Sequence, residues 1–364
     1  LQNSLQYSID NGLNSFTETD PISGKYLMQG AGVVIDNSTG YVAAIVGGRG
    51  TDDEYNRGFL AERQPGSTMK PIGVYGPAMD TGRYYPSLIM TDKYIEGGPQ
   101  NYVKGSYSGN VTLRYALARS INTIPFQILM DIQPSTALEY LGKMRFDTLT
   151  PADNNGSLAL GGMTYGVRVC DLAKAYYTIQ NKGIYSDNNC LTKLDFQSKG
   201  TLYEDTVNLT QIYEPDVAYL LTDMLKTVAT EGTGVSVSGH PTGAKTGTTS
   251  DDRDSWYAGF TKQYTTVVWV GYDTPREIPG LARNKYALNI WLDFMNRTHE
   301  TLPAEDWEKP ESVVYKYVDG DGKIADYDTG KSDLFSQTLI DRLEEQEKQK
   351  EAERLRAYAQ EWAD

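Results

Sequence analysis

The sequence predicts an α+β protein in which strands precede and follow a largely helical middle third. Two β-rich runs, 31–36 and 41–48, enclose an Asn-Ser-Thr-Gly turn and indicate a hairpin. Three more runs, 242–249, 255–261 and 264–272, are closely spaced and rich in β-branched and aromatic residues. Apolar residues between the two groups recur at helical spacing. We therefore expect antiparallel sheet structure on both sides of a helical segment.

Composition narrows the class of protein. The 364 residues are 39% hydrophobic, enough for one large domain or two tightly joined subdomains. The net charge of −14 argues against a general nucleic-acid binder, which needs a basic face. With two histidines and no Cys/His cluster, we expect no metal site, and any serine chemistry should use lysine. Cys170 and Cys190 could pair or could both be buried thiols, and we favour free thiols. No stretch approaches the eighteen consecutive apolar residues that indicate a membrane-spanning helix.

The first half of the chain contains three recognisable helical patterns. Residues 1–16 place leucine and isoleucine at spacing four, which predicts a short packing helix. A second helix should begin near Ser67 and end near Gly82. Residues 91–110 indicate a long ordered loop, and residues 111–129 return to helical spacing.

The helical pattern of residues 111–129 is interrupted at Ser120 to Asn122. Pro125 disfavours helix at the residue before it, so we expect a break between two helices here. A break of this kind can direct side chains into a cleft, or it can be a plain helix boundary.

The later part of the chain contains five more predicted elements. Amphipathic helices are expected at 170–180, 215–229 and 286–296. A small hairpin should turn at 319–322. The charged stretch 341–362 predicts a helix that is either a solvated face or, as the sharper alternative, a partner-binding helix.

Ser67 and Lys70 form a Ser-x-x-Lys pair directly after a Pro-Gly turn. If a helix begins at Ser67, the spacing of three places Lys70 on the same face, and the hydroxyl lies at the electropositive helix N-terminus. This is a nucleophile beside a candidate base. Taken alone, the pair is also what an ordinary serine cap would look like.

Three short motifs then follow one another in a fixed order. They are Ser67-x-x-Lys70, Ser120-Ile121-Asn122 and Lys245-Thr246-Gly247. Ser-x-x-Lys, a Ser-Asp-Asn element and Lys-Thr-Gly together form the signature of β-lactamases and penicillin-binding proteins. Over roughly residues 25–300 the sequence resembles the transpeptidase domain of a class A, bifunctional penicillin-binding protein. Further similar stretches are Gln29-Gly30-Ala31, Val42 to Gly48, Tyr55-Asn56-Arg57, Arg63-Gln64-Pro65-Gly66, Val111-Thr112-Leu113-Arg114, Ser157 to Gly162 and Gly232-Thr233-Gly234.

The resemblance implies a penicillin-binding-protein/serine β-lactamase-like fold. A five-stranded antiparallel sheet flanked by helices is joined to an all-helical subdomain, and the site lies between them. Residues 1–25 are then a linker remnant from a missing N-terminal glycosyltransferase domain, and 26–300 are the transpeptidase domain. Residues 301–364 are a C-terminal hairpin extension and charged helix. The family also carries an N-terminal membrane anchor.

The chemistry explains why a lysine should lie near Ser67. A serine hydroxyl is a weak nucleophile, so a neighbouring group must take its proton. Lys70 can do this only when it is neutral, which requires its pKa to fall from about 10.4 to about 7. Burial and a second cation, for which Lys245 is the candidate, could supply that change.

The resemblance assigns a role to each remaining motif residue. Ser120 relays the proton to the leaving nitrogen, and Asn122 hydrogen-bonds the amide of the substrate. Lys245, Thr246 and Thr248 hold the terminal carboxylate, and Gly247 lets a strand edge approach the substrate. The oxyanion hole should be the backbone N–H groups of Ser67 and Thr248. Asp254 and Trp256 are interpreted as structural.

The implied activity is that of a serine D,D-transpeptidase. It would cross-link peptidoglycan stem peptides through an acyl-enzyme on Ser67, without a cofactor, at the extracytoplasmic face of a bacterial membrane. β-Lactams would inhibit it covalently. Ile121, where class A β-lactamases carry aspartate, favours a penicillin-binding protein. The alternatives are a D,D-carboxypeptidase or β-lactamase, or a non-catalytic penicillin sensor.

Overall fold

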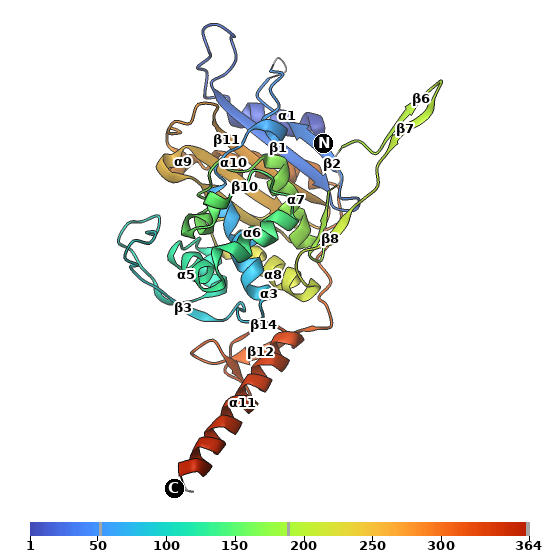
Figure 1. Cartoon of the computed structure of the whole chain (residues 1–364). Helices are drawn as coiled ribbons and strands as arrows, with labels where there is room; N and C mark the ends of the chain where they lie inside the picture. Colours follow the sequence, from blue (N-terminus) through green and yellow to red (C-terminus); the bar gives the residue numbers. More distant parts are fainter. Residues whose placement is uncertain (51–52, 188–189, 362–364) are drawn as a thin grey trace.

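A five-stranded antiparallel sheet forms the centre of the molecule in the computed structural model, which describes residues 1–50, 53–187 and 190–361 (Figure 1). Its strand order is β2-β1-β11-β10-β9, which confirms the predicted sheet. The two groups of strands, far apart in the sequence, meet where β1 pairs with β11 from Met28↔Tyr272 to Asp36↔Tyr264. The strands are β1 (Met28–Asp36), β2 (Val42–Val46), β9 (Gly243–Thr248), β10 (Asp254–Phe260) and β11 (Tyr264–Tyr272).

Helices cover both faces of this sheet, so β1, β10 and β11 are buried almost throughout. Successive side chains of β11 point to opposite faces: Val267 and Trp269 join the larger hydrophobic core, and Val268 and Val270 join a second core. Helices α1 (Gln2–Gly12) and α10 (Tyr286–His299) close the second core, and α7 (Val169–Gln180) closes the larger one. A strand buried on both faces explains the long apolar runs in the sequence.

The remaining helices gather on one side of the sheet and form a helical lobe (Figure 1). They share the larger core with the inner face of the sheet. The helices of this lobe are α3 (Gly76–Asp80), α4 (Leu113–Ala118), α5 (Thr123–Ile132), α6 (Pro134–Lys143) and α8 (Pro215–Glu231). Shorter helical turns are α2 (Arg57–Leu60), α9 (Leu281–Asn284), η3 (Pro151–Asp153), η4 (Gly156–Leu160) and η5 (Ser250–Asp252).

The helix predicted from Ser67 is present, but it changes its winding along its length. It begins as the 3₁₀ turn η1 (Gly66–Thr68), widens into the π-helical segment η2 (Lys70–Tyr75) and ends as α3. Pro71 and Pro77 lack the backbone N–H that a regular α-helical ladder needs. A π-helical segment inside a helix is frequently found at a functional site.

The loop expected at residues 91–110 is bounded by a small sheet that the sequence did not indicate. Strand β3 (Ile89–Asp92) pairs with β4 (Gly109–Thr112). Each strand has only four residues of mixed polarity, which is too short for a period-two pattern to emerge. The predicted break at Ser120 to Asn122 is confirmed, because α4 ends at Ala118 and α5 begins at Thr123.

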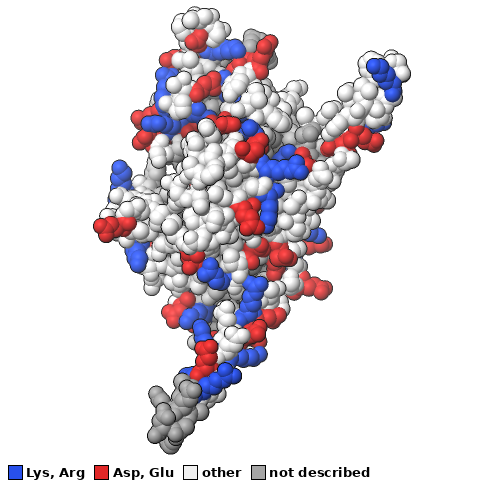
Figure 2. All heavy atoms as spheres, in the orientation of Figure 1, with Lys and Arg blue, Asp and Glu red and all other residues white. Residues whose placement is uncertain are grey.

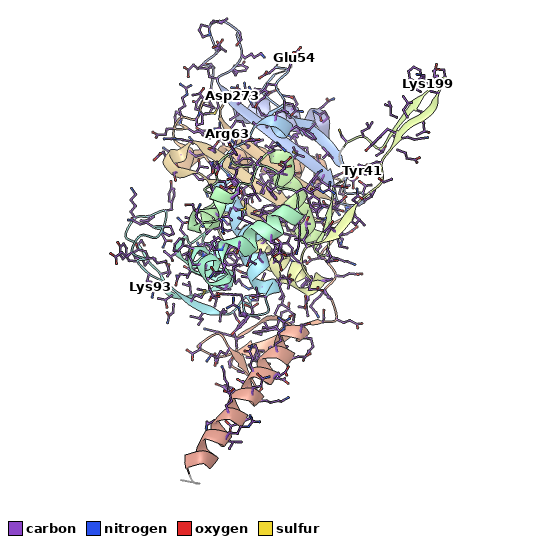
Figure 3. The ribbon with its side chains drawn as sticks, viewed as in Figure 1. Tyr41, Glu54, Arg63, Lys93, Lys199 and Asp273 are labelled. Atoms are coloured by element: carbon purple, nitrogen blue, oxygen red, sulfur yellow. The ribbon has the colours of Figure 1, made fainter. Side chains whose placement is uncertain are left out.

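Two small hairpins lie between α7 and α8. Strand β5 (Ile184–Ser186) pairs with β8 (Leu209–Gln211) beside the body, and β6 (Lys193–Phe196) pairs with β7 (Gly200–Glu204). The second hairpin projects away from the body, with Lys199 at its tip (Figures 1 and 3). Cys170 is buried and Cys190 is exposed, and both are free thiols as predicted.

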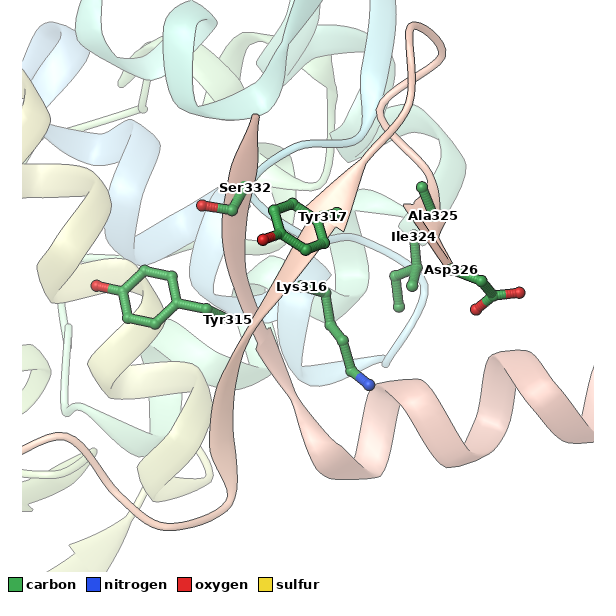
Figure 4. Close-up of a pocket in the computed structure, with 7 residues that line it drawn as sticks. All are labelled: Tyr315, Lys316, Tyr317, Ile324, Ala325, Asp326 and Ser332. Carbon is green, nitrogen blue, oxygen red and sulfur yellow. The ribbon is translucent and has the colours of Figure 1, made fainter. Parts of the chain in front are cut away.

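The C-terminal part forms a three-stranded sheet followed by a long helix. Strands β12 (Val313–Val318), β13 (Ile324–Ala325) and β14 (Ser332–Ser336) pair in the order β13-β12-β14. The first two form the predicted hairpin. Helix α11 (Gln337–Glu361) starts four residues earlier than expected, and its predicted last residue, Trp362, lies outside the described residues. An open pocket on this sheet is lined by Tyr315, Lys316, Tyr317, Ile324, Ala325, Asp326 and Ser332 (Figure 4).

Two surface properties bear on function. On the visible face of the molecule, acidic and basic side chains are interspersed (Figure 2). Within the described part of the chain, no helix combines the length and the apolar character needed to cross a bilayer.

The domain boundaries at 25 and 300 stay predictions. Trp307, Val313 and Leu334, beyond the second boundary, are nevertheless part of the larger core.

Candidate active site

The three motifs, far apart in the sequence, meet beside strand β9. Ser67 lies in η1, Lys70 begins η2, and Ser120 lies in the turn between α4 and α5. Lys245 comes from β9 itself. The sheet and the helical lobe thus each contribute to one cluster.

The Ser120 hydroxyl lies between two lysines. Its Oγ accepts a hydrogen bond of 2.8 Å from Lys245 Nζ and a longer one of 3.3 Å from Lys70 Nζ. Both lysine side chains are fully buried. A hydroxyl in this position can pass a proton between its neighbours, because it donates and accepts at the same atom.

The backbone of Ser120 explains how its side chain reaches this position. Helix α4 ends in a Schellman motif: the N–H of Ser120 bonds to Leu117 O, and the N–H of Ile121 bonds to Ala116 O. The motif places Ser120 in the left-handed region, at φ 55°. Glycine is the usual residue there, so a serine at this position is strained by about 1–3 kcal/mol.

Lys70 is held by the segment that follows the Ser120 turn. Its Nζ donates to Ser120 O at 2.7 Å, Ile121 O at 3.0 Å and Asn122 Oδ1 at 2.7 Å. With the longer contact to Ser120 Oγ, Nζ has four oxygen acceptors around it, one more than the three hydrogens of an ammonium group can bond singly. Burial, and secondly the charge of Lys245, act against that charge and hold the pKa of Lys70 well below its ordinary value.

Lys245 experiences the same burial. Its Nζ also donates to Thr246 O at 3.1 Å, and burial lowers its pKa to about 7. The charge of Lys245 also contributes to the lowered pKa of Lys70, because two buried cations close together are unfavourable. Lysines of this kind are typical of functional sites.

Ser67 is only half-buried, and close backbone packing fixes the segment before it. Gly66 has φ 56°, and a Cβ on it would lie 2.6 Å from Thr248 O. A Cβ on Gly161, in the turn after η4, would lie 2.5 Å from Gly66 O. Glycine is therefore needed at both positions. This packing brings the backbone at Ser67 next to that of Thr248, the two groups expected to form the oxyanion hole.

Gly247 has a packing role besides the expected one. A Cβ there would lie 2.6 Å from Pro65 O and 2.8 Å from Thr68 Cγ2. The sequence predicts a glycine here because a substrate strand must approach. The structure gives a second reason: β9 itself lies so close to the segment carrying Ser67 that a side chain would not fit between them.

A buried ion pair ties this segment to the sheet. Arg63 Nε and Nη2 both lie 2.8 Å from Asp254 Oδ1, and Arg63 Nη1 donates to Asp273 O at 3.1 Å. Asp254 also accepts from Trp269 Nε1 and from the hydroxyl of Thr249, directly after β9. The structural interpretation of Asp254 fits these contacts.

Two further contacts act on the same segment. Trp256 Nε1 donates to Gln64 O at 2.8 Å, which fits its structural interpretation. The Gln64 side chain in turn exchanges two hydrogen bonds with the backbone of Met163. The residues before Ser67 are thus held on two sides, by β10 and by the turn after η4.

Thr233 is a neighbour of the site to which the sequence assigned no role. Its hydroxyl lies 2.9 Å from that of Thr246, and its N–H donates to Ala118 O at 3.1 Å. In the sequence, the Gly232-Thr233-Gly234 stretch is only one of the points of resemblance to the family. Spacing could not reveal the contact, because it joins the end of α8 to β9 through tertiary packing.

No cluster of three or more metal-ligating side chains occurs among the residues that the structure covers. The open pocket of Figure 4 belongs to the C-terminal sheet, and none of the motif residues lines it. The cluster around Ser120 combines hydroxyl groups with two buried lysines, which suits nucleophilic attack, proton transfer and binding of an anionic group.

Comparison with known proteins finds a matching family. A family model described as "Penicillin binding protein transpeptidase domain" matches residues 30–286. A similar curated protein is penicillin-binding protein 1A of Aquifex aeolicus, 35% identical over 82% of this chain and 42% of its own length.

Solved structures show the same fold. Penicillin-binding protein 1A from Haemophilus influenzae has a TM-score of 0.73 at 22% identity, over 85% of this chain and 53% of that one. The PonA1 protein from Mycobacterium tuberculosis, in complex with penicillin V, has a TM-score of 0.68 at 23% identity, over 89% of both chains. The chain spans about two fifths of the length of the curated relatives it matches.

Proposed function

Since the chain belongs to the penicillin-binding protein transpeptidase family, we propose that it is a serine D,D-transpeptidase that cross-links peptidoglycan stem peptides. The observation that carries this proposal is that the Ser120 hydroxyl lies between Lys70 and Lys245. Lys70 in turn follows Ser67 by one helical turn. A serine nucleophile needs a nearby base that is neutral at working pH, and the lowered pKa of Lys70 supports that role.

The proposed reaction begins with a proton transfer. Lys70 Nζ takes the proton of the Ser67 hydroxyl while Ser67 Oγ attacks the carbonyl carbon of the penultimate D-Ala. The developing oxyanion is stabilised by the backbone N–H groups of Ser67 and Thr248. Lys70 then returns the proton through Ser120 to the nitrogen of the terminal D-Ala, which leaves as a free amino acid.

Substrate binding would use the other end of the cluster. Lys245, with the hydroxyls of Thr246 and Thr248, binds the terminal carboxylate of the stem peptide. Asn122 hydrogen-bonds its amide. The amine of a second stem peptide then attacks the ester on Ser67, so an amide forms and Ser67 recovers its proton.

The same groups would react with β-lactams. Ser67 opens the lactam ring, and the leaving nitrogen stays attached to the acyl group, so the adduct persists. We further propose that the longer protein is class A. Its glycosyltransferase domain would lie elsewhere in the chain, and the transpeptidase would work at the extracytoplasmic face of the bacterial membrane.

The decisive experiment is a mass measurement. Incubation with a penicillin should add the mass of one antibiotic, and peptide mapping should place it on the peptide that contains Ser67. A Ser67→Ala variant should remain unmodified. Covalent labelling of that variant would disprove the nucleophile.

The lifetime of the adduct separates the proposal from a β-lactamase. A transpeptidase should keep the penicillin far longer than the seconds that a β-lactamase needs for turnover. A penicillin sensor would form an equally stable adduct, but it would release no D-Ala from a pentapeptide donor offered with an acceptor amine.

A further inference from the structure

A fully buried aspartate, Asp92, lies behind the helical-lobe side of the site. It ends strand β3, and its side chain is 1% exposed. None of the ion pairs among the described residues involves it. Burying a carboxylate without a cation is costly unless hydrogen bonds replace its water. The function proposed above gives this residue no role.

Four hydrogen bonds replace that water. Asn101 Nδ2 donates to both carboxylate oxygens, at 2.9 and 3.0 Å. The Thr123 hydroxyl donates at 2.5 Å, and the N–H of Ser108 donates at 2.7 Å. Asn101 and Ser108 belong to the 93–108 loop, and Thr123 is the first residue of α5. The carboxylate of Asp92 therefore links strand β3, the loop and the helix.

Asn101 extends this network to Asn122. An ionised carboxylate only accepts, so Asn101 must turn its Nδ2 toward Asp92 and its Oδ1 away. That Oδ1 accepts the N–H of Asn122 at 2.9 Å. The side chain of Asn122 is held as well, because its Nδ2 donates to Gln100 O at 2.8 Å. Asn122 Oδ1 is thereby directed at Lys70 Nζ, 2.7 Å away.

We propose that Asp92 is a positioning residue for acylation, which holds Asn122 against Lys70 through Asn101, Thr123 and the 93–108 loop. The inference rests on the proposed function and adds a residue to it. Asp92 touches neither lysine nor Ser67. It acts by fixing the start of α5 and the loop that carries Gln100 and Asn101.

Replacing Asp92 should slow acylation without abolishing the fold. In Asp92→Asn the side chain keeps its size but loses the charge and one acceptor, so Asn101 is free to turn. A displacement of about 1 Å at a reacting group can cost up to roughly 100-fold in rate. We expect the rate constant for penicillin acylation to fall by about 10-fold or more.

The measurement is the time course of fluorescent-penicillin labelling, followed to completion. Partial unfolding lowers the final amount of adduct but leaves the rate constant of the folded fraction unchanged. Mispositioning of Asn122 lowers the rate constant while the final amount stays near one per chain. The second pattern supports the proposal, and an unchanged rate constant overturns it.

Two further variants complete the test. Asp187→Asn is the control away from the motifs: Asp187 also holds an asparagine amide and a backbone N–H, both of Asn208, and in addition it pairs with Arg145 at 3.1 Å. It should label at the wild-type rate. Asn101→Ala breaks the link while leaving Asp92 in place, so it decides the question if Asp92→Asn does not fold. A wild-type protein that forms no adduct would instead refute the proposed function itself.

Discussion

At the residue scale, the site depends on two lysines placed where water cannot reach them. The unfolded chain keeps Lys245 protonated up to about pH 10.4. The folded protein gives up that proton near pH 7, because burial lowers the pKa to about 7. Between these two pH values the unfolded chain binds one more proton than the folded protein. The free energy of unfolding therefore rises as the pH increases and falls as the pH decreases.

We therefore predict a pH-dependent stability that Lys245→Met reduces. From about pH 7 to about pH 8.5, Lys245 should add up to about 1.4 kcal/mol per pH unit to the free energy of unfolding. This window stays below the ordinary pKa of the Cys170 thiol, 9.0. Urea unfolding of both proteins at the two pH values measures the slopes. Equal slopes would contradict the lowered pKa.

Ser120 tests whether backbone strain is stored at the site. We predict that Ser120→Gly is more stable than Ser120→Ala by about 1 kcal/mol, because only glycine adopts φ 55° without cost. Both variants lose the hydroxyl, so both should lose rapid penicillin labelling. Urea unfolding compares their stabilities. If alanine proves as stable as glycine, the turn is unstrained.

At the element scale, three elements must touch for Ser67 to face strand β9. The turn after η4 packs on η1, and η1 packs on β9, with glycine at each contact. Because these contacts are between backbones, no side-chain movement can relieve an added methyl group. The geometry of the nucleophile thus depends on a turn that contributes no reacting group.

We predict that Gly161→Ala slows penicillin labelling by roughly 10-fold or more and destabilises the protein by about 2 kcal/mol or more. The methyl group would lie 2.5 Å from Gly66 O, and Gly161 has φ 74°. Labelling kinetics and urea unfolding are the measurements. Gly142→Ala, in helix α6 with open space around it, is the control and should be neutral or stabilising. Similar behaviour of the two variants would disprove the contact.

At the scale of the whole molecule, the C-terminal sheet is attached to the helical lobe that carries Ser120. Arg114 of α4 bonds to Asp223 of α8 at 2.6 Å and to Asp333 of β14 at 2.5 Å. Phe335 is fully buried and packs against Tyr85, with ring centroids 5.3 Å apart. By contrast, α11 is exposed from residue 344 through residue 356.

We predict that the two parts of this region contribute unequally to stability. Phe335→Ala should cost about 3–5 kcal/mol through loss of burial and creation of a cavity. Removal of residues 348–364 should leave the melting temperature nearly unchanged, since the described side chains from 348 to 356 are exposed. Thermal unfolding compares the two variants with the intact chain. A large loss on truncation would show that α11 has a role in folding.

Much of the architecture could be predicted from local patterns. Strands β9 to β11 follow from β-branched and aromatic runs, and the helix at Ser67 follows from its Pro-Gly start. The break at Ser120 was predicted from Pro125, but Ile124 before that proline is helical, and the Schellman motif at Ser120 is what ends α4. Strands β3 and β4 could not be predicted, because four-residue strands of mixed polarity carry no period. The sequence did not indicate the two hairpins within residues 184–211 either.

The sequence by itself determined the residue types, their order and the helix boundaries at Ser67 and Ser120, because propensities and turn chemistry act over a few neighbouring residues. Only the tertiary structure decided that Ser120 lies between Lys70 and Lys245, that Thr233 meets Thr246, and that Asp92 supports Asn122. These contacts join residues from 13 to 125 positions apart. Burial, which lowers the pKa of both lysines, likewise exists only once the sheet and the helical lobe have packed together.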